Sequence, residues 1–152
     1  MPKEYYKTLA VRNFDDVFNG VSPSLATCRR QFGENGLIAT QAIMTIIIKD
    51  LISSFNVGQT MNDEQVADLI NEIIDCYYWL KIEDFRFCFN NAKRGVYDKA
   101  VFRLDANVIL TWLDKYTSDR LNAAESTQIS QHTANKFSDN LPKIDYSKFK
   151  NI

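Results

Sequence analysis

The chain has 152 residues, the length of one domain, and its 45% apolar and 12% aromatic content argues against intrinsic disorder. Five glycines and three prolines are too few for the many turns of an all-β sandwich. The net charge of −1 excludes a strongly basic nucleic-acid-binding protein and an acidic tail protein as overall classes, but it leaves local charged patches open.

The N-terminal segment, residues 1–21, has little apolar periodicity, and we expect an N-terminal arm there. Within it, Phe14, Val17 and Phe18 should form one turn that packs on the body. The charged start of the chain has no apolar stretch of the kind found in secretory signals, so no signal peptide is predicted.

A helical domain should begin at Ser22, which can act as an N-cap. Pro23 suits the first helical position because it has no amide proton to leave unpaired. The resulting short helix, over residues 24–32, should end at Gly33.

A longer helix is predicted over residues 37–55. Its apolar residues cover nearly the whole circumference, which is typical of a central helix surrounded by others. The β-branched run Ile46–Ile48 favours a strand locally, but the length of the apolar stretch favours a helix. The most apolar run, Ala42–Ile48, is far shorter than the about 20 residues of a membrane span, so we expect a buried helix and no membrane contact.

Two further helices have clear ends. Residues 60–65 offer an N-cap and first-turn acids for a strongly amphipathic helix over 63–78. A helix over 82–94 follows, with two acids in its first turn, two bases at its end and Gly95 after it.

The remainder of the chain is predicted to form one extended segment and one helix. Residues 96–104 should be extended, and Asp105 should cap a last helix that runs to about residue 124. The apolar period fades from residue 125, so the helix either frays or continues exposed, and 141–152 form a mobile tail or a docking peptide.

The sequence therefore predicts an all-α fold, a single compact bundle of about five helices with a short extended segment near 96–104 and a mobile C-terminal tail. The expected organisation is an N-terminal arm (1–21), a helical domain (22–124), and a polar helix extension with the tail (125–152).

The cysteines Cys28, Cys76 and Cys88 do not have metal-ligand spacing, and His132 has no cysteine near it. We interpret all three as reduced core thiols of a cytoplasmic protein. That compartment would be the host cytoplasm if a phage encodes the chain.

No cofactor, metal or catalytic site is predicted. Glu72 and Asp75 share a helix face and could hold a cation, but such pairs are usually only solvated. The acids Glu83 and Asp84 are best interpreted as ordinary first-turn acids. No phosphate-binding loop, nucleophile elbow or dinucleotide fingerprint is present in the sequence.

Basic residues alternate with aromatic ones between residues 86 and 103, where five cations accompany a single acid. Cations neutralise phosphates, and aromatic faces stack on unpaired bases, so this segment is a candidate nucleic-acid site. The same patch could equally be a solvated face or a protein contact, and Phe102 could belong to the core. Arg29 and Arg30 would extend the patch if their helix folds beside that of 82–94. The candidate nucleic-acid-binding residues are Arg86, Lys93, Arg94, Tyr97, Lys99 and Arg103, with Tyr97 for stacking.

Three runs carry a resemblance to a known family: NVGQTMNDEQV (56–66), WLKIEDFRFCFNNAKRGVY (79–97) and RLDANVILTWLDKY (103–116). Together they resemble a family of small uncharacterised proteins encoded by phages and mobile elements of gut Bacteroidales. The resemblance covers the middle of the chain and brings no established activity. The order of these helices is also similar to that of phage helicase-loader and replisome-organiser domains, but 96–103 stands where those proteins have a proline-rich closing segment.

We therefore expect a non-enzymatic helical adaptor of a phage or mobile element that assists DNA replication or another DNA transaction. It would act through a protein partner and the basic–aromatic patch. The alternative is a structural, virion-associated or host-interaction protein, for which an oligomer is an expected form. In it the patch and the tail bind protein instead.

Overall fold

The computed structural model describes residues 2–139, with the side chains of residues 3–136. Within this range the chain forms helices and loops, and its β-structure is limited to isolated bridges. The all-α prediction is confirmed. The helices are α1 (Pro2–Thr8), α2 (Phe14–Phe18), α3 (Leu25–Gln31), the 3-10 helix η1 (Gly33–Asn35), α4 (Gly36–Ser53), α5 (Asp63–Cys76), α6 (Ile82–Lys93) and α7 (Ala106–Asp139).

The chain divides into two compact units, Met1–Thr117 and Ser118–Ile152. The first unit holds α1 to α6 and the start of α7. In the second unit the described residues continue α7 to Asp139, beyond the predicted end near residue 124. Of the two predicted outcomes for this polar stretch, the exposed helix is the one observed. The predicted tail, 141–152, lies outside the described residues.

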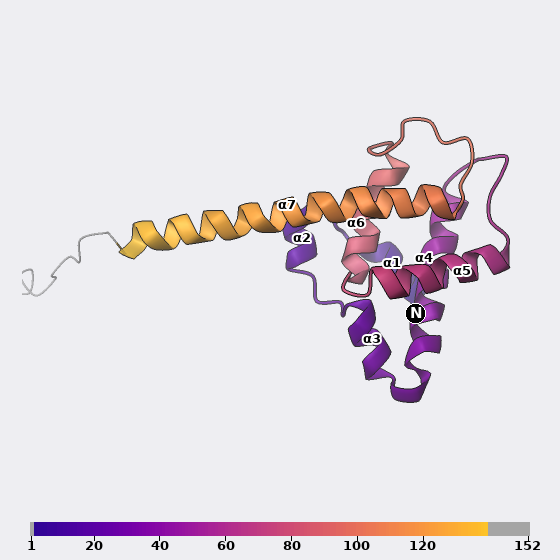
Figure 1. The fold of residues 1–152 in the computed structure, drawn as a ribbon, viewed down its shortest axis with the longest axis horizontal. Coiled ribbons are helices and arrows are strands. Elements are labelled where there is room, and N and C mark those ends of the chain that lie inside the picture. Colours follow the sequence, from indigo (N-terminus) through magenta and orange to yellow (C-terminus); the bar gives the residue numbers. More distant parts are fainter. Residues whose placement is uncertain (1, 140–152) are drawn as a thin grey trace, which may run out of the picture. The chain divides into compact units, whose positions relative to one another are not determined.

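Helix α4 packs against α1, α3, α5 and α6 in the first unit (Figure 1). The run Ile46–Ile48 is helical, as predicted, because contacts with four helices outweigh its local preference for a strand. The prediction that α4 is enclosed on all sides is wrong. Ile38 is 67% exposed and Ala42 is also exposed, because the neighbours of α4 cover one side of it. The covered stripe consists of Thr40, Met44, Ile47, Ile48 and Leu51.

By length and composition alone, Gly33–Ser53 would be able to cross a membrane, a test that core helices of soluble proteins also pass. Only part of the segment is buried in the protein.

The connection between α3 and α4 depends on two glycines. Gly33 has a φ of 57°, the left-handed conformation predicted for the residue after the helix. A Cβ atom on Gly36 would lie 1.7 Å from the carbonyl oxygen of Arg29, so the two helices approach each other closely only because Gly36 has no side chain.

The start of α3 differs from the prediction by two residues. Ser24 is the N-cap, and its hydroxyl oxygen accepts a hydrogen bond from the backbone N–H of Thr27. Ser22 is buried instead, and its backbone N–H donates to Glu83 Oε1 at 3.1 Å. Ser22, the N-cap that the local sequence predicts, is therefore bound through its backbone by the distant carboxylate of Glu83.

The first turn of α6 carries the main buried polar contacts of the fold. Asp84 is fully buried, and it accepts hydrogen bonds from the backbone N–H of Lys81 at 2.8 Å and from the hydroxyl of Tyr116 at 2.6 Å. The Lys81 ammonium group donates to the carbonyl oxygens of Val17 at 2.6 Å and Gly20 at 3.0 Å. One turn of α6 thus fixes both α7 and the N-terminal segment.

The N-terminal segment is consequently part of the folded body. Tyr6, Val11 and Val17 are buried in the common core. The predicted turn with Phe14 and Phe18 is confirmed as α2. Helix α1 is too short for an apolar period to show in the sequence, so only the tertiary structure reveals it.

Gly36→Ala should destabilise the protein by about 2–4 kcal/mol, because the added methyl group meets the Arg29 carbonyl. Gly58→Ala is the matched control, since a Cβ atom at Gly58 would lie in open space, and it should change stability by less than about 1 kcal/mol. Urea unfolding of both variants measures the difference. Equal stabilities would contradict the described approach of α3 and α4.

Asp84→Asn should cost about 2–3 kcal/mol, and Tyr116→Phe about 1–2 kcal/mol, because each change disrupts buried hydrogen bonds. Glu64→Gln removes an exposed first-turn acid from α5 and should cost less than about 1 kcal/mol. Thermal and urea unfolding should rank the three variants in this order. If Asp84→Asn were as mild as Glu64→Gln, Asp84 would not hold α6 and α7 together.

Candidate nucleic-acid interface

The loop between α6 and α7 is fixed at two points. The indole N–H of Trp112 donates to Asp98 Oδ2 at 2.7 Å. Leu104 is buried, and its backbone N–H donates to the carbonyl oxygen of Gln59 at 3.0 Å, beside a parallel bridge between Gln59 and Arg103. The segment predicted to be extended near 96–104 is non-helical, as expected, but it contains several bends and one bridge residue, Arg103. The contacts of Asp98 and Leu104 fix its shape.

Around these anchors, the chain from the end of α6 to Arg103 presents apolar and basic side chains to solvent. Phe102 is 85% exposed and Val96 is 61% exposed. Lys99 and Arg103 are exposed on the same loop, and Arg94 is exposed at the end of α6. An aromatic side chain that is exposed to solvent among cations contributes little to the core. Packing therefore does not explain why a phenylalanine occupies position 102.

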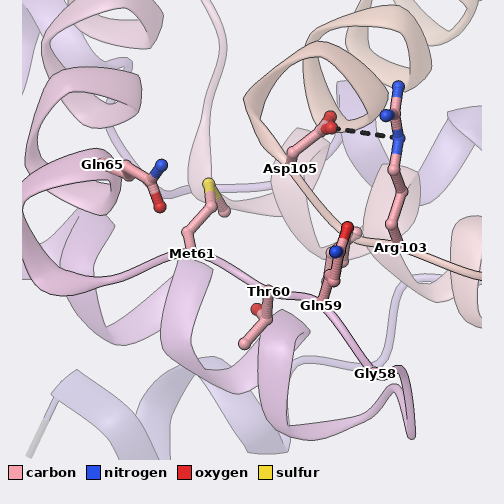
Figure 2. Close-up of a pocket in the computed structure, with 8 residues that line it drawn as sticks. Gly58, Gln59, Thr60, Met61, Gln65, Arg103 and Asp105 are labelled. Carbon is pink, nitrogen blue, oxygen red and sulfur yellow. Dashed lines mark ion pairs between the residues drawn. The ribbon is translucent and has the colours of Figure 1, made fainter.

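Arg103 also borders a cavity of about 630 Å³ between the α4–α5 loop and the start of α7. Figure 2 shows Met61 and Gln65 on one side of this cavity, with Arg103 and Asp105 on the other. Arg103 Nε lies 3.2 Å from Asp105 Oδ2, and Asp105 caps α7, as predicted, by accepting the backbone N–H of Val108. The ion pair with Asp105 therefore orients the Arg103 guanidinium group, which is still exposed to solvent.

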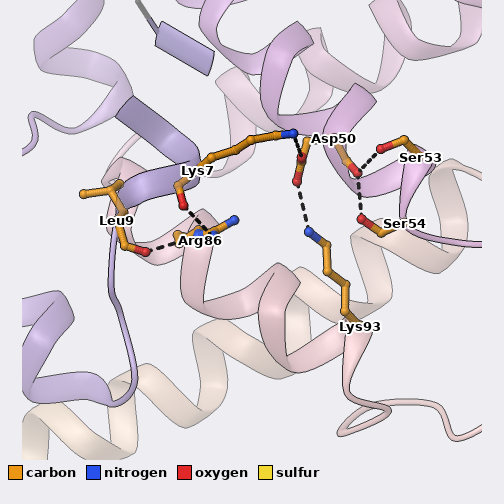
Figure 3. A network of polar contacts seen from close by, with 7 residues as sticks. All are labelled: Lys7, Leu9, Asp50, Ser53, Ser54, Arg86 and Lys93. Carbon is orange, nitrogen blue, oxygen red and sulfur yellow. Dashed lines mark hydrogen bonds and ion pairs between the residues drawn. The ribbon is translucent and has the colours of Figure 1, made fainter. Parts of the chain in front are cut away.

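Two of the predicted phosphate-binding residues make contacts inside the protein. Arg86 donates to the carbonyl oxygens of Lys7 at 3.0 Å and Leu9 at 3.3 Å (Figure 3). The Lys93 ammonium group pairs with Asp50 at 2.9 Å. Arg86 thereby holds the N-terminal segment on α6, a structural role that no local pattern indicates.

The other two predicted residues near the end of α6 differ in exposure. Arg94 is exposed, and its guanidinium group donates to the side chain of Asn91 at 3.1 Å. Tyr97 is half-buried and packs against the core. Tyr97 is therefore not a free stacking surface, whereas Phe102 on the same loop is exposed.

The structure also brings in cations from elsewhere in the sequence. Arg12, from the connection between α1 and α2, lines a pocket together with Lys93 and Arg94. Sequence analysis missed Arg12 because no local motif surrounds it. Arg29 and Arg30 are exposed on α3, whose principal neighbour is α4 and not α6.

The thiols do not all lie where they were predicted. Cys28 and Cys88 are buried, and burial raises the pKa of both thiols. Cys76 is exposed, so its assignment to the core is wrong. It is the last residue of α5 and lies off the apolar stripe of that helix. Its thiol donates to Glu72 at 3.4 Å.

The acids of α5 do not converge with others. Within residues 2–139 no group of three or more histidine, cysteine, aspartate or glutamate side chains is placed to hold a metal ion. Glu72, one of the two acids considered for a cation, instead accepts the hydrogen bond from Cys76.

Comparisons of this chain with protein-family models, with curated proteins and with solved structures find no match. The resemblance to the phage and mobile-element family therefore stays a prediction.

Glu72→Gln should make Cys76 react faster with iodoacetamide. The hydrogen bond to Glu72, followed by desolvation, raises the pKa of the Cys76 thiol, so removing the carboxylate lowers that pKa and increases the thiolate fraction at mildly alkaline pH. Mass spectrometry of the native protein should show severalfold faster labelling of Cys76, with Cys28 and Cys88 protected. Asp68→Asn, a change of the same charge elsewhere on α5, should leave the rate almost unchanged. Equal rates in the two variants would contradict the Glu72 contact.

Proposed function

We propose that the protein is a non-enzymatic helical adaptor of a phage or mobile element, acting in the host cytoplasm, that assists DNA replication or another DNA transaction. It would bind single-stranded nucleic acid weakly through the α6–α7 loop and would hold a protein partner through a separate apolar surface. The observation that carries the proposal is Phe102, an 85% exposed aromatic side chain on an anchored loop among three exposed cations.

The chemistry of the loop suits an unpaired strand. Stacking of a base on an aromatic ring contributes about 1–3 kcal/mol and tolerates any sequence. Arg94, Lys99 and Arg103 supply charge for phosphates on the same stretch of chain. The single acid of the loop, Asp98, accepts the Trp112 hydrogen bond, so its carboxylate has a role in the fold.

The protein-contact part of the proposal draws on the turn between α3 and α4. Phe32 is 54% exposed there, and Leu37 and Ile38 of the first turn of α4 are also exposed. Neighbouring exposed apolar side chains of this kind are typical of protein contacts. The same surface favours the alternative function, a structural, virion-associated or host-interaction protein with no nucleic-acid role.

The test neutralises the three exposed cations together, as Arg94→Gln/Lys99→Gln/Arg103→Gln. Fluorescence anisotropy with labelled oligothymidylate, across a series of salt concentrations, should give weaker binding. The slope of log K against log salt should decrease by about 2, because each lost phosphate contact with a single strand removes about 0.7. Phe102→Ala should weaken binding and leave the salt slope unchanged, because stacking releases no counterions.

The matched control is Lys3→Gln/Lys115→Gln/Lys136→Gln, which removes the same charge from exposed lysines outside the loop. It should keep most of the wild-type slope. Lys93 is left intact because a change there would disturb Asp50. Absent or salt-independent binding by the wild type would overturn the proposal, and a stable oligomer unaffected by either triple variant would favour the structural alternative.

A further inference from the structure

A second cationic surface lies where the α1–α2 connection meets the end of α6. It encloses a cavity of about 450 Å³, large enough for a phosphate group with part of a sugar. The wall carries three cations and an amide, and none of the lining residues in this described region is acidic. The lining residues are Leu9, Ala10, Val11, Arg12, Asn90, Lys93 and Arg94.

Lys93 is held in place from behind. Its ammonium group lies 2.9 Å from Asp50 Oδ2, and the Asp50 side chain is only 10% exposed. Lys7 approaches the other oxygen of Asp50 at 3.8 Å (Figure 3). Two lysines thus share one carboxylate, which leaves a net positive charge at this point and two further N–H donors on Lys93.

The opposite wall is equally fixed. Arg86 donates to the carbonyl oxygens of Lys7 and Leu9, and Val11 is buried in the core. The backbone N–H of Arg12 donates to Asp16 Oδ2 at 2.9 Å, which orients the connection. This carboxylate contacts the backbone of the segment and is not among the residues that line the cavity.

A helix C-terminus normally disfavours an anion, because its last carbonyl oxygens carry partial negative charge. At the end of α6 these oxygens accept backbone hydrogen bonds. Asn90 accepts from Arg94 N–H, Asn91 from Val96 N–H, and Ala92 from Gly95 N–H. The three cations therefore determine the local field.

We propose that Arg12, Lys93 and Arg94 form a binding pocket for a phosphate group. This pocket deepens the proposed function. It rests on that function to the extent that Arg94 belongs to both the pocket and the nucleic-acid-binding loop. One source of such a group is the backbone of a single strand bound by the α6–α7 loop. A free phosphate compound would engage the same three cations.

The test begins without nucleic acid. Isothermal titration of the full-length protein with sodium pyrophosphate, against sodium chloride at matched ionic strength, should show saturable binding. Arg12→Gln and Arg94→Gln should each weaken it by at least about tenfold, the cost of losing a hydrogen bond between charged groups. Lys115→Gln should retain wild-type affinity. Circular dichroism and thermal unfolding verify that each variant is folded.

Arg12→Gln is the informative variant, because it leaves the loop and α6 unchanged. The proposed phosphate pocket would be wrong if the wild-type protein did not bind pyrophosphate. It would also be wrong if the Arg12→Gln variant bound pyrophosphate with full affinity. Competition between pyrophosphate and oligothymidylate, together with weaker strand binding by Arg12→Gln, would identify the backbone phosphate as the ligand.

The two proposals fail separately. If oligothymidylate binds and the loop variants weaken it, while pyrophosphate does not bind, the pocket is wrong and the adaptor function stands. If pyrophosphate binds through Arg12 and no oligonucleotide binds, the ligand is a free phosphate compound and the proposed function falls.

Discussion

The buried carboxylate of Asp84 is the contact on which the arrangement of the first unit depends. Removing a carboxylate from water is costly unless hydrogen bonds replace its hydration. Here one oxygen accepts the Lys81 backbone N–H and the other accepts the Tyr116 hydroxyl, so the start of α6 and the third turn of α7 have one permitted placement. Because the Lys81 side chain also binds the carbonyl oxygens of Val17 and Gly20, the N-terminal segment is fixed at the same place.

This anchoring accounts for both surfaces to which function is assigned. Arg86, four residues after Ile82, extends the attachment of the N-terminal segment to α6 and so brings Arg12 beside Arg94. Beyond the end of α6, the Asp98–Trp112 hydrogen bond fixes the loop while leaving Phe102 in solvent. Both surfaces are thus built on rigid supports, which lowers the entropy lost when a ligand binds.

Local chemistry accounts for the features that were predicted correctly. Gly33 and Gly95 follow helices and have positive φ, and Asp105 caps α7. Asn62 and Gln65 form a reciprocal capping box at the start of α5. Each of these signals involves residues no more than a few positions apart, so the sequence carries the whole interaction. Ser22 shows the limit, because its backbone N–H is bound by Glu83, 61 positions away.

The amino-acid sequence alone predicts that the chain is helical, where most of its helices begin and end, and that cations gather between residues 86 and 103. The tertiary structure decided which of those side chains are available. It placed Arg86 in internal contacts, paired Lys93 with Asp50 beside the Arg12 pocket, turned Tyr97 toward the core and left Phe102 outside. The physical reason is that helix ends follow from neighbouring residues, whereas burial follows from partners that are distant in the chain and leave no local pattern.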